Sequence, residues 1–256
     1  MTTPAIVANL ARGQSFRLVW VNELGGLTFE MRYEDTDCFL KWAPVGSGLD
    51  LAGEAARLRW VAPFTTAPRV LDIGEDNGGS WLLTQAIRGN SAASERWTSD
   101  PERAVIAIGQ GLRHLHDRAP VTECPFTWSI EDRVGTTRQR YADGQLDPTR
   151  WDERNQGLEI TNALARLDRP PSIDRLVVCH GDACAPNTLV GEDGLWAGHV
   201  DFGSLGTADR WADLSIATWS TEWNYGQGWE RPLLEAYGIE PDEERTEFYR
   251  LLWDLS

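Results

Sequence analysis

Alternating apolar and polar residues predict β-strands in the first third of the chain. The predicted strands cover residues 15–23, 27–33, 38–42, 68–76 and 80–87, with turns at 24–26, 34–37 and 76–79. Residues 50–63 instead carry Leu51, Ala55 and Leu58 at helical spacing. The N-terminal region should therefore be a five-stranded antiparallel sheet with one helix inserted after its third strand.

Beyond residue 90 the hydrophobic pattern becomes mainly helical. Helices are predicted over 101–117, 127–143, 154–168 and 209–256, the last with breaks at 224–228 and 237–241, and short strands lie within 174–202. Pro101 stands at an expected first helical position. We predict an α+β chain of two lobes: a small β-rich N-terminal lobe over 1–87 and a larger, mainly helical lobe over 88–256.

Composition restricts the partners of this chain of 256 residues. The formal net charge of −15 argues against nucleic acid and anionic membranes, which require a cationic surface. The acidity could serve solubility alone, or it could attract a cationic ligand. The start of the sequence lacks the apolar core of a signal peptide and no run is long enough to span a bilayer, so we expect a cytoplasmic protein. No feature indicates an obligate protein partner.

The cysteine pattern does not indicate a metal site. The four cysteines show no CxxC pairing, although Cys179 and Cys184 flank a His-Gly-Asp triplet. A zinc site would need more ligands at tighter spacing. The cysteines are therefore expected to fill the core.

Lys41 is the only lysine in the chain, and the other 23 of the 24 basic residues are arginine. Lysine is a compact point charge on a flexible stem, which suits a contact with one phosphate oxygen in a narrow pocket, whereas arginine is a flat fork. From composition alone, drift is the better explanation of a single lysine. Its position on the third predicted strand makes it a candidate phosphate ligand.

Phosphoryl transfer from ATP needs few protein groups, and the chain contains them in order. Lys41 is followed by Glu54, which lies on the next helix at a position where it can pair with the lysine. Asp182 follows His-Gly and could orient or deprotonate an attacking hydroxyl group. Asn187 and Asp201 supply the oxygen ligands that Mg²⁺ prefers. Each motif alone is weak, and an isolated Asp-Phe-Gly is more often a turn, but the ordered set indicates a kinase.

A glycine-rich turn is also a candidate for phosphate binding. Gly25 and Gly26 lie between the first two predicted strands, where main-chain N–H groups could cover phosphates. The spacing is not GxGxxG, so an ordinary hairpin turn explains these glycines as well.

At these residues the chain resembles the aminoglycoside phosphotransferase family, above all its 3′-phosphotransferase (kanamycin kinase) branch. The resemblance covers nearly the whole chain and rests most firmly on "VVCHGDACAPNTLV" and "GHVDFGSLGTADRWADLSIAT". It implies a two-lobed, protein-kinase-like fold that binds ATP and Mg²⁺. It also implies that the enzyme transfers the γ-phosphoryl group to a hydroxyl group, the 3′ one, of an aminoglycoside antibiotic. This reaction would confer resistance to the antibiotic.

The resemblance also implies roles for individual residues. The implied set is Asp182 as the catalytic carboxylate, Asn187 and Asp201 as metal ligands, Lys41 (oriented by Glu54) at the α- and β-phosphates, and main-chain groups of Thr84 and Ala86 at adenine. His180 would brace the catalytic loop, and Asp209 and Asp213 would hold that loop and the next helix.

The resemblance further implies that acidic residues bind a polycationic substrate. The matching positions are Asp152, Glu153, Asp254 and the terminal carboxylate of Ser256. Two departures bear on this implied site. Ser204 stands where the family has an arginine, and the tail has Trp253 and Ser256 where an acid and an aromatic residue are usual. Two alternatives stay open: a kinase of another small hydroxylated compound, and a nucleotide-binding pseudokinase.

Overall fold

The structure, a computed structural model, describes residues 3–256 and has an α+β fold, which confirms the predicted fold class. The chain forms two compact units. The N-terminal unit comprises the residues up to Arg88 together with Gly198–Gly203, and the C-terminal unit comprises Gly89–Ala197 and Ser204–Ser256. The division into domains at residues 87 and 88 stays a prediction. The sequence did not indicate that Gly198–Gly203 packs with the N-terminal unit.

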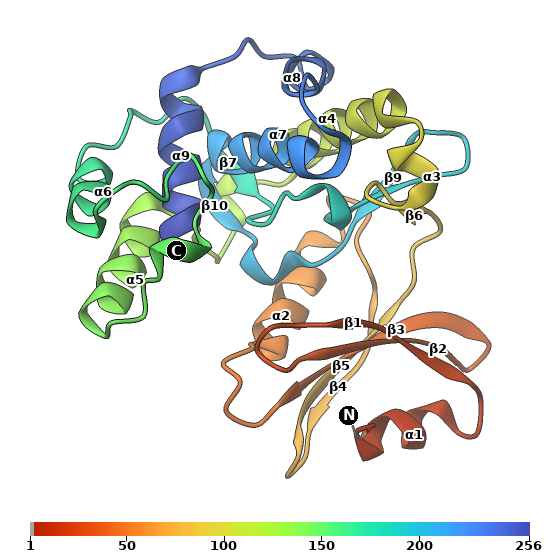
Figure 1. Ribbon diagram of the computed structural model, residues 1–256. Helices are drawn as coiled ribbons and strands as arrows, with labels where there is room; N and C mark the ends of the chain where they lie inside the picture. Colours follow the sequence, from red (N-terminus) through yellow and green to blue (C-terminus); the bar gives the residue numbers. More distant parts are fainter. Residues whose placement is uncertain (1–2) are drawn as a thin grey trace. The chain divides into compact units, whose positions relative to one another are not determined.

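The N-terminal unit contains a five-stranded antiparallel sheet and two helices (Figure 1). Its elements are α1 (Ala5–Ala11), β1 (Phe16–Val21), β2 (Leu27–Tyr33), β3 (Thr36–Pro44), α2 (Leu51–Val61), β4 (Val70–Glu75) and β5 (Gly79–Gln85). The strand order is β1-β2-β3-β5-β4, so β5 pairs with β3 and β4 lies at an edge. The helix inserted after the third strand is confirmed, whereas α1 was not predicted.

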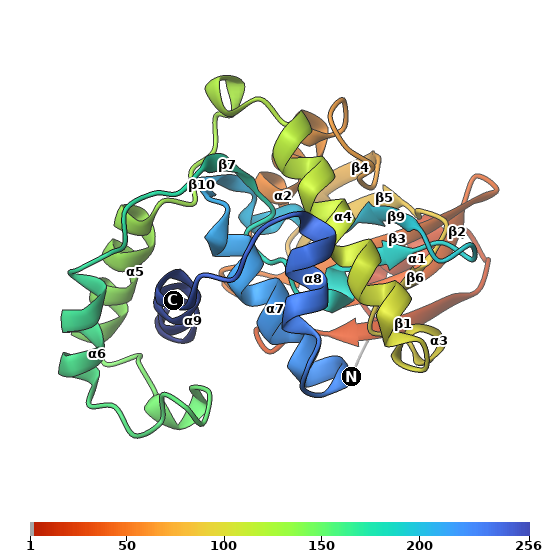
Figure 2. The same ribbon diagram turned by 90° about the horizontal axis from the view of Figure 1, so that it is seen from above.

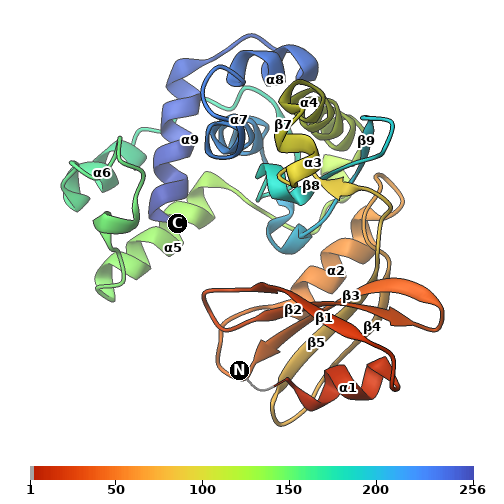
Figure 3. The ribbon, with the colours of Figure 1, turned by 45° about the vertical axis from the view of Figure 1, so that its right-hand side comes forward.

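The two faces of this sheet have different partners because side chains alternate along each strand. On one face, Phe29 and Leu40 form a hydrophobic core with Val7 of α1. Lys41, which pairs with Leu82 in the register of β3 and β5, points to the opposite face. Helix α2 covers that face, as the positions of α1 and α2 on either side of the sheet show (Figures 1 and 3).

The C-terminal unit is mainly helical. Its strands are β6 (Asn90–Ser91), β7 (Leu176–Cys179), β8 (Thr188–Val190), β9 (Trp196–His199), which ends in the N-terminal unit, and β10 (Gly206–Asp209). Its α-helices are α3 (Glu95–Thr98), α4 (Pro101–Arg118), α5 (Ile130–Ala142), α6 (Ile160–Leu167), α7 (Trp211–Tyr225), α8 (Glu230–Tyr237) and α9 (Glu243–Leu255). The 3₁₀ helices of the chain are η1 (Val121–Glu123), η2 (Pro148–Arg150), η3 (Ala185–Asn187) and η4 (Phe202–Ser204).

Helix α7 forms the centre of the C-terminal unit. Its residues from Trp211 to Thr221 are all buried, and α4, α8 and α9 pack around it (Figure 2). Because α7 is buried on all sides, it shows no polar outer face, unlike the amphipathic helix α4, and its buried polar side chains, such as that of Thr218, form hydrogen bonds within the unit. No helix within residues 3–256 is long and apolar enough to cross a membrane.

One predicted helix is shorter than its sequence pattern suggests. The prediction began at residue 154, but α6 begins at Ile160. The main-chain oxygen of Asp152 accepts hydrogen bonds from the N–H groups of Asn155 and Gln156, so the chain turns here before the helix begins. This turn brings Asp152 and the residues after it to α7 and α9.

Candidate active site

Lys41 lies at the centre of an ion-pair cluster in the N-terminal unit. Its Nζ donates to Glu54 Oε1 at 2.7 Å and to Asp201 Oδ1 at 2.8 Å. Burial opposes the positive charge, but the carboxylates of Glu54 and Asp201 outweigh it and raise the pKa of Lys41. Lys41 is therefore an ammonium group at neutral pH, and its predicted pairing with Glu54 is present.

The main chain at Asp201 is unusual. Its φ of 67° is in the left-handed region, where a residue other than glycine is uncommon. Asp201 is one of the six residues between 198 and 203 that pack with the N-terminal unit, which explains how it reaches Lys41 across 160 positions of sequence. Strained main-chain geometry of this kind is often found at functional sites.

The glycine-rich segment is a hairpin turn between β1 and β2. Gly25 has a φ of 84°, and its N–H donates to the main-chain oxygen of Asn22 at 3.0 Å. The side chain of Asn22 accepts a hydrogen bond from the N–H of Leu24 at 2.7 Å. Two of the N–H groups that could have faced phosphates are therefore bonded within the turn.

The two residues implied to contact adenine lie at the end of β5. Thr84 is opposite Phe39 in the sheet register. The main-chain N–H of Ala86 donates to the oxygen of Asp37 at 2.8 Å. The carbonyl oxygen of Ala86 would therefore be the atom that accepts a hydrogen bond from a base, and the roles of Thr84 and Ala86 stay predictions.

In the C-terminal unit, the His-Gly-Asp triplet forms a tight loop after β7. Gly181 has a φ of 85°, and a Cβ atom there would lie only 2.1 Å from the main-chain oxygen of Ser204. Only glycine fits this position, because a side chain would face both an unfavourable φ and a steric clash. The triplet therefore needs glycine immediately before Asp182.

Asp213 holds this loop, as the sequence predicted. Its carboxylate accepts the N–H groups of His180 at 2.6 Å and Gly181 at 2.9 Å. Burial disfavours the charged carboxylate, but hydrogen bonds from His116 and from the main chain keep the pKa of Asp213 below its ordinary value. Asp213 is therefore a buried, ionised acceptor that fixes the main chain just before Asp182.

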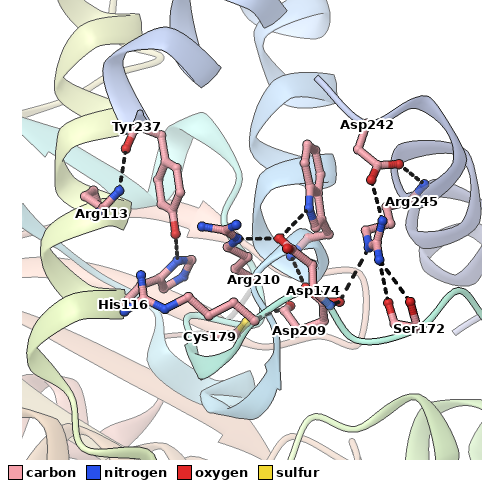
Figure 4. Close-up of polar contacts among 12 residues, drawn as sticks. Arg113, His116, Ser172, Asp174, Cys179, Asp209, Arg210, Tyr237, Asp242 and Arg245 are labelled. Atoms are coloured by element: carbon pink, nitrogen blue, oxygen red, sulfur yellow. Dashed lines mark hydrogen bonds and ion pairs between the residues drawn. The ribbon is translucent and has the colours of Figure 1, made fainter. Parts of the chain in front are cut away.

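The support of Asp213 continues into the helices. His116 on α4 contacts Asp213 through Nε2 at 3.0 Å, and its Nδ1 lies 2.9 Å from the hydroxyl oxygen of Tyr237 (Figure 4). A second set of contacts joins Arg210 to Asp174, whose carboxylate also accepts the indole N–H of Trp211. These contacts connect the catalytic-loop region to α4, α7 and α8.

Asp182 and Asn187 come close together on the loop. The amide Nδ2 of Asn187 donates to the main-chain oxygen of Asp182 at 3.0 Å. Asp182 Oδ1 is buried and accepts no hydrogen bond from the residues that the structure describes. A buried carboxylate oxygen without a partner is costly unless a ligand satisfies it. The side-chain oxygens of Asp182 and Asn187 could coordinate a magnesium ion or accept a hydrogen bond from a hydroxyl group.

The predicted substrate acids are only partly brought together. Asp254 Oδ2 accepts the main-chain N–H of Asp152 at 3.2 Å and the side chain of Asn155 at 2.7 Å, and burial raises the pKa of Asp254. Glu153 is exposed. The hydroxyl group of Ser256 accepts a hydrogen bond from Arg133 at 3.0 Å.

The sequence analysis missed two residues at this acidic cluster. Arg154 forms an ion pair with Asp152 at 3.1 Å and a second one with Glu222 on α7. The arginine directly after the two acids in "WDER" was the only sign that the segment contains its own counter-ion.

Three comparisons with known proteins identify the family. A family model described as the phosphotransferase enzyme family (APH) matches residues 7–249. An aminoglycoside 3′-phosphotransferase of Streptomyces fradiae is 38% identical over 221 residues, which are 82% of this chain and 81% of the relative. A streptomycin 3″-kinase of Streptomyces griseus is 32% identical over 93% of this chain and 90% of the relative.

Solved structures agree with these matches. The crystal structure of a type VIII aminoglycoside 3′-phosphotransferase has a TM-score of 0.84 and 30% sequence identity, with 98% of each chain covered. An aminoglycoside phosphotransferase of Streptomyces rimosus, in complex with ADP and streptomycin, has a TM-score of 0.78 and 28% identity, with 98% of this chain and 97% of that chain covered. The family predicted from the sequence is confirmed: this chain belongs to the APH family of phosphotransferase enzymes.

Proposed function

We propose that this enzyme transfers the γ-phosphoryl group of ATP to a hydroxyl group, the 3′ one, of an aminoglycoside antibiotic and thereby confers resistance. The observation that carries the proposal is the buried Oδ1 atom of Asp182, which has no partner among the described residues although its loop is rigidly held. Relatives that are 38% and 36% identical are named aminoglycoside 3′-phosphotransferases, which supports the choice of acceptor.

In this proposal Asp182 orients the attacking hydroxyl group and accepts its proton. A carboxylate suits this role because a positioned base accelerates proton transfer by about a hundredfold or more. The rigid support from Asp213 and His116 favours the role, since a well-held base requires little reorganisation in the transition state. His180 would act by bracing the loop, because its Nδ1 lies 3.3 Å from the main-chain N of Asp182.

Lys41 would neutralise charge on the α- and β-phosphates. Its ammonium group is already held by Glu54, so little side-chain freedom would be lost on binding. Its contact with Asp201 would then give way to nucleotide, which releases the Asp201 carboxylate for a second role. Main-chain groups of Thr84 and Ala86 would contact adenine.

Asn187 and Asp201 would hold Mg²⁺, with Asp182 nearby in the chain. The amide nitrogen of Asn187 is turned to the main chain, which leaves its carbonyl oxygen as the donor for a cation. When bound, the ion would neutralise the negative charge that develops on the transferred phosphoryl group.

Asp152, Glu153, Asp254 and Ser256 would bind the ammonium groups of the substrate. The contact between Asp254 and the main chain of Asp152 supports a shared site for the first and third of these residues. We also propose that the enzyme acts in the cytoplasm, where its nucleotide is found, without an obligate protein partner.

The proposal is tested by measuring ADP formation over a panel of aminoglycosides and other hydroxylated amines. We expect turnover with kanamycin- or neomycin-type compounds and none with the Asp182→Asn variant. Turnover confined to non-aminoglycoside alcohols would replace the proposed substrate with another small hydroxylated compound. Nucleotide binding without turnover on any acceptor would indicate a pseudokinase.

A further inference from the structure

The segment between α5 and α6 inserts an arginine among the acids proposed to bind the substrate. Asp152 Oδ1 accepts both the main-chain N–H of Arg154 at 3.0 Å and its Nε at 3.1 Å. Arg154 Nη2 donates to the carboxylate of Glu222. The side chain of Arg154 is nevertheless 50% exposed, whereas those of Asp152 and Glu222 are 15% and 21% exposed. A built-in cation therefore covers two partly buried carboxylates.

An aromatic side chain fixes the position of this arginine. The guanidinium carbon of Arg154 lies 5.5 Å from the ring centre of Trp219, and that of Arg250 lies 5.4 Å from the same ring. Cation–π contacts of this kind hold a guanidinium group where it is partly desolvated. The indole Nε1 of Trp219 is buried and has no hydrogen-bond partner among the residues described.

A second carboxylate next to Glu222 adds to the negative charge. Glu230 on α8 forms an ion pair with Arg250 at 2.9 Å and shares a hydrogen bond with Glu222. Burial and this shared hydrogen bond raise the pKa of Glu222. Arg154 and Arg250 thus pair with two neighbouring carboxyl groups.

The charge balance of this cluster limits what it can bind. Asp152, Glu222, Glu230 and Asp254 bring four carboxyl groups together, and because Glu222 and Glu230 share one proton, the four carry about three negative charges. Arg154 and Arg250 neutralise two of these charges. A substrate with many ammonium groups would meet the exposed guanidinium of Arg154 and be repelled by it. Loss of the Arg154 charge would therefore favour ligands that carry many ammonium groups more than ligands that carry few.

The cluster adjoins a cavity, and helix α7, which carries Glu222, also contacts the catalytic loop. Arg154, Asn155 and Glu230 line a cavity of about 820 Å³ in the C-terminal unit. One turn of α7 connects the cluster to the loop, because the hydroxyl oxygen of Ser220 accepts the N–H of Ala185 at 2.9 Å. Glu222 lies on the same helix. Helix α7 therefore supplies residues both to the cluster and to the support of the loop that carries Asp182.

We propose that Arg154 is a specificity-determining residue, a built-in cation that occupies part of the acidic substrate site and weakens the binding of polycations, the more so the more ammonium groups they carry. The inference rests on the proposed function, because that function makes the acidic cluster the substrate site. A purely structural arginine, which only ties its segment to α7, would affect all ligands equally.

The test compares Arg154→Gln, which removes the charge, with Arg154→Lys, which keeps it. Arg231→Gln is the matched control, because it removes the same charge from the exposed Arg231–Glu235 pair on α8. Calorimetry at low salt measures the Kd of kanamycin, spermine and 1,4-diaminobutane for each protein. ADP formation with kanamycin is measured in parallel, and the thermal midpoint shows whether each variant is folded.

We expect Arg154→Gln to bind kanamycin and spermine about tenfold more tightly, since two carboxylates are released and one exposed ion pair contributes up to about fivefold. Its affinity for 1,4-diaminobutane should change by less than about threefold, and Arg154→Lys and Arg231→Gln should resemble the wild type. A gain equal to that of Arg231→Gln, or no gain for spermine in a folded Arg154→Gln variant, overturns the inference.

The two proposals can fail separately. If the wild type phosphorylates kanamycin but Arg154→Gln gains no affinity for polycations, the proposed function stands and the role of Arg154 is wrong. If no variant phosphorylates an aminoglycoside but Arg154→Gln gains affinity for spermine, the aminoglycoside function is wrong while Arg154 is still the built-in cation of the site.

Discussion

Replacing Asp213 with asparagine should impair both stability and turnover, because this carboxylate fixes the loop that carries Asp182. The two oxygens of Asp213 accept hydrogen bonds from His180 N, Gly181 N and His116 Nε2 at 2.6–3.0 Å. Asparagine has one oxygen, so its amide group must face at least one of these N–H donors.

The size of the effect follows from these contacts. A hydrogen bond to a charged group contributes about 1.5–3 kcal/mol, and a buried donor without a partner costs about 1–3 kcal/mol. Asp213→Asn should therefore lower the free energy of unfolding by about 3–5 kcal/mol. For a chain of this size, the thermal midpoint should fall by about 10 °C.

The effect on turnover should be specific to kcat. A displacement of Asp182 by about 1 Å can reduce the rate about a hundredfold, whereas ATP binding depends on other residues. We expect kcat to fall by about ten- to a hundredfold with little change in the KM for ATP. The assay is ADP formation at saturating acceptor, combined with thermal unfolding of the same samples.

Asp209→Asn is the matched control. Asp209 is also buried, and it accepts the main-chain N–H groups of Asp174 and Trp211 at 2.8 Å and 3.1 Å, which lie outside the Gly181 loop. It should lose stability with a smaller loss of kcat. If Asp213→Asn keeps kcat within about threefold of the wild type, or if both variants lose kcat equally, the proposed role of Asp213 is wrong.

Four further predictions concern the same residues. Asp182→Ala should reduce kcat at least about a hundredfold while the calorimetric Kd for ATP stays nearly unchanged, and a variant that keeps a tenth of the rate would contradict its role. Lys41→Arg should raise the KM for ATP, because a guanidinium fork cannot replace the ammonium between Glu54 and Asp201, and unchanged kinetics would mean that drift explains the single lysine. Gly181→Ala should lower the thermal midpoint by more than about 5 °C, given the 2.1 Å approach of a Cβ atom, and a smaller shift would mean that the loop can relax. The pKa of Asp213 is lower in the folded than in the unfolded state, so the ionised carboxylate stabilises the fold above the unfolded pKa of about 4. This stabilisation is lost as the pH falls through the lower folded value. Asp213→Asn should therefore make the decrease of the thermal midpoint at acidic pH less steep.

Local patterns predicted much of the fold. Strand alternation and turn residues gave the five-stranded sheet, and the position of Glu54 one turn into the next helix gave its pairing with Lys41 at 2.7 Å. These features depend on residues close in sequence. The swapped order of β4 and β5 was not predictable in this way, because strand order is decided by packing across the sheet.

The contacts that the sequence did not reveal join distant residues. Arg154 and Glu222 are 68 positions apart, and Lys41 and Asp201 are 160 positions apart. A charged side chain can pair with many others in a folded chain. Composition therefore indicates that the site is acidic, but not how many of its negative charges are neutralised by arginine. Asp152 and Asp254 were predicted to act together and are joined by a hydrogen bond, yet the counter-ion of Asp152 two residues later was missed.

The most direct test of the proposed function is ADP formation with kanamycin and with its 3′-deoxy analogue, measured for the wild type and for Asp182→Asn. The proposal predicts that the wild type phosphorylates kanamycin at the 3′ hydroxyl group, that the 3′-deoxy analogue is not phosphorylated at a comparable rate, and that Asp182→Asn is inactive. Equal phosphorylation of both compounds would contradict the 3′ position. ADP formation that no aminoglycoside stimulates would contradict the proposed function itself.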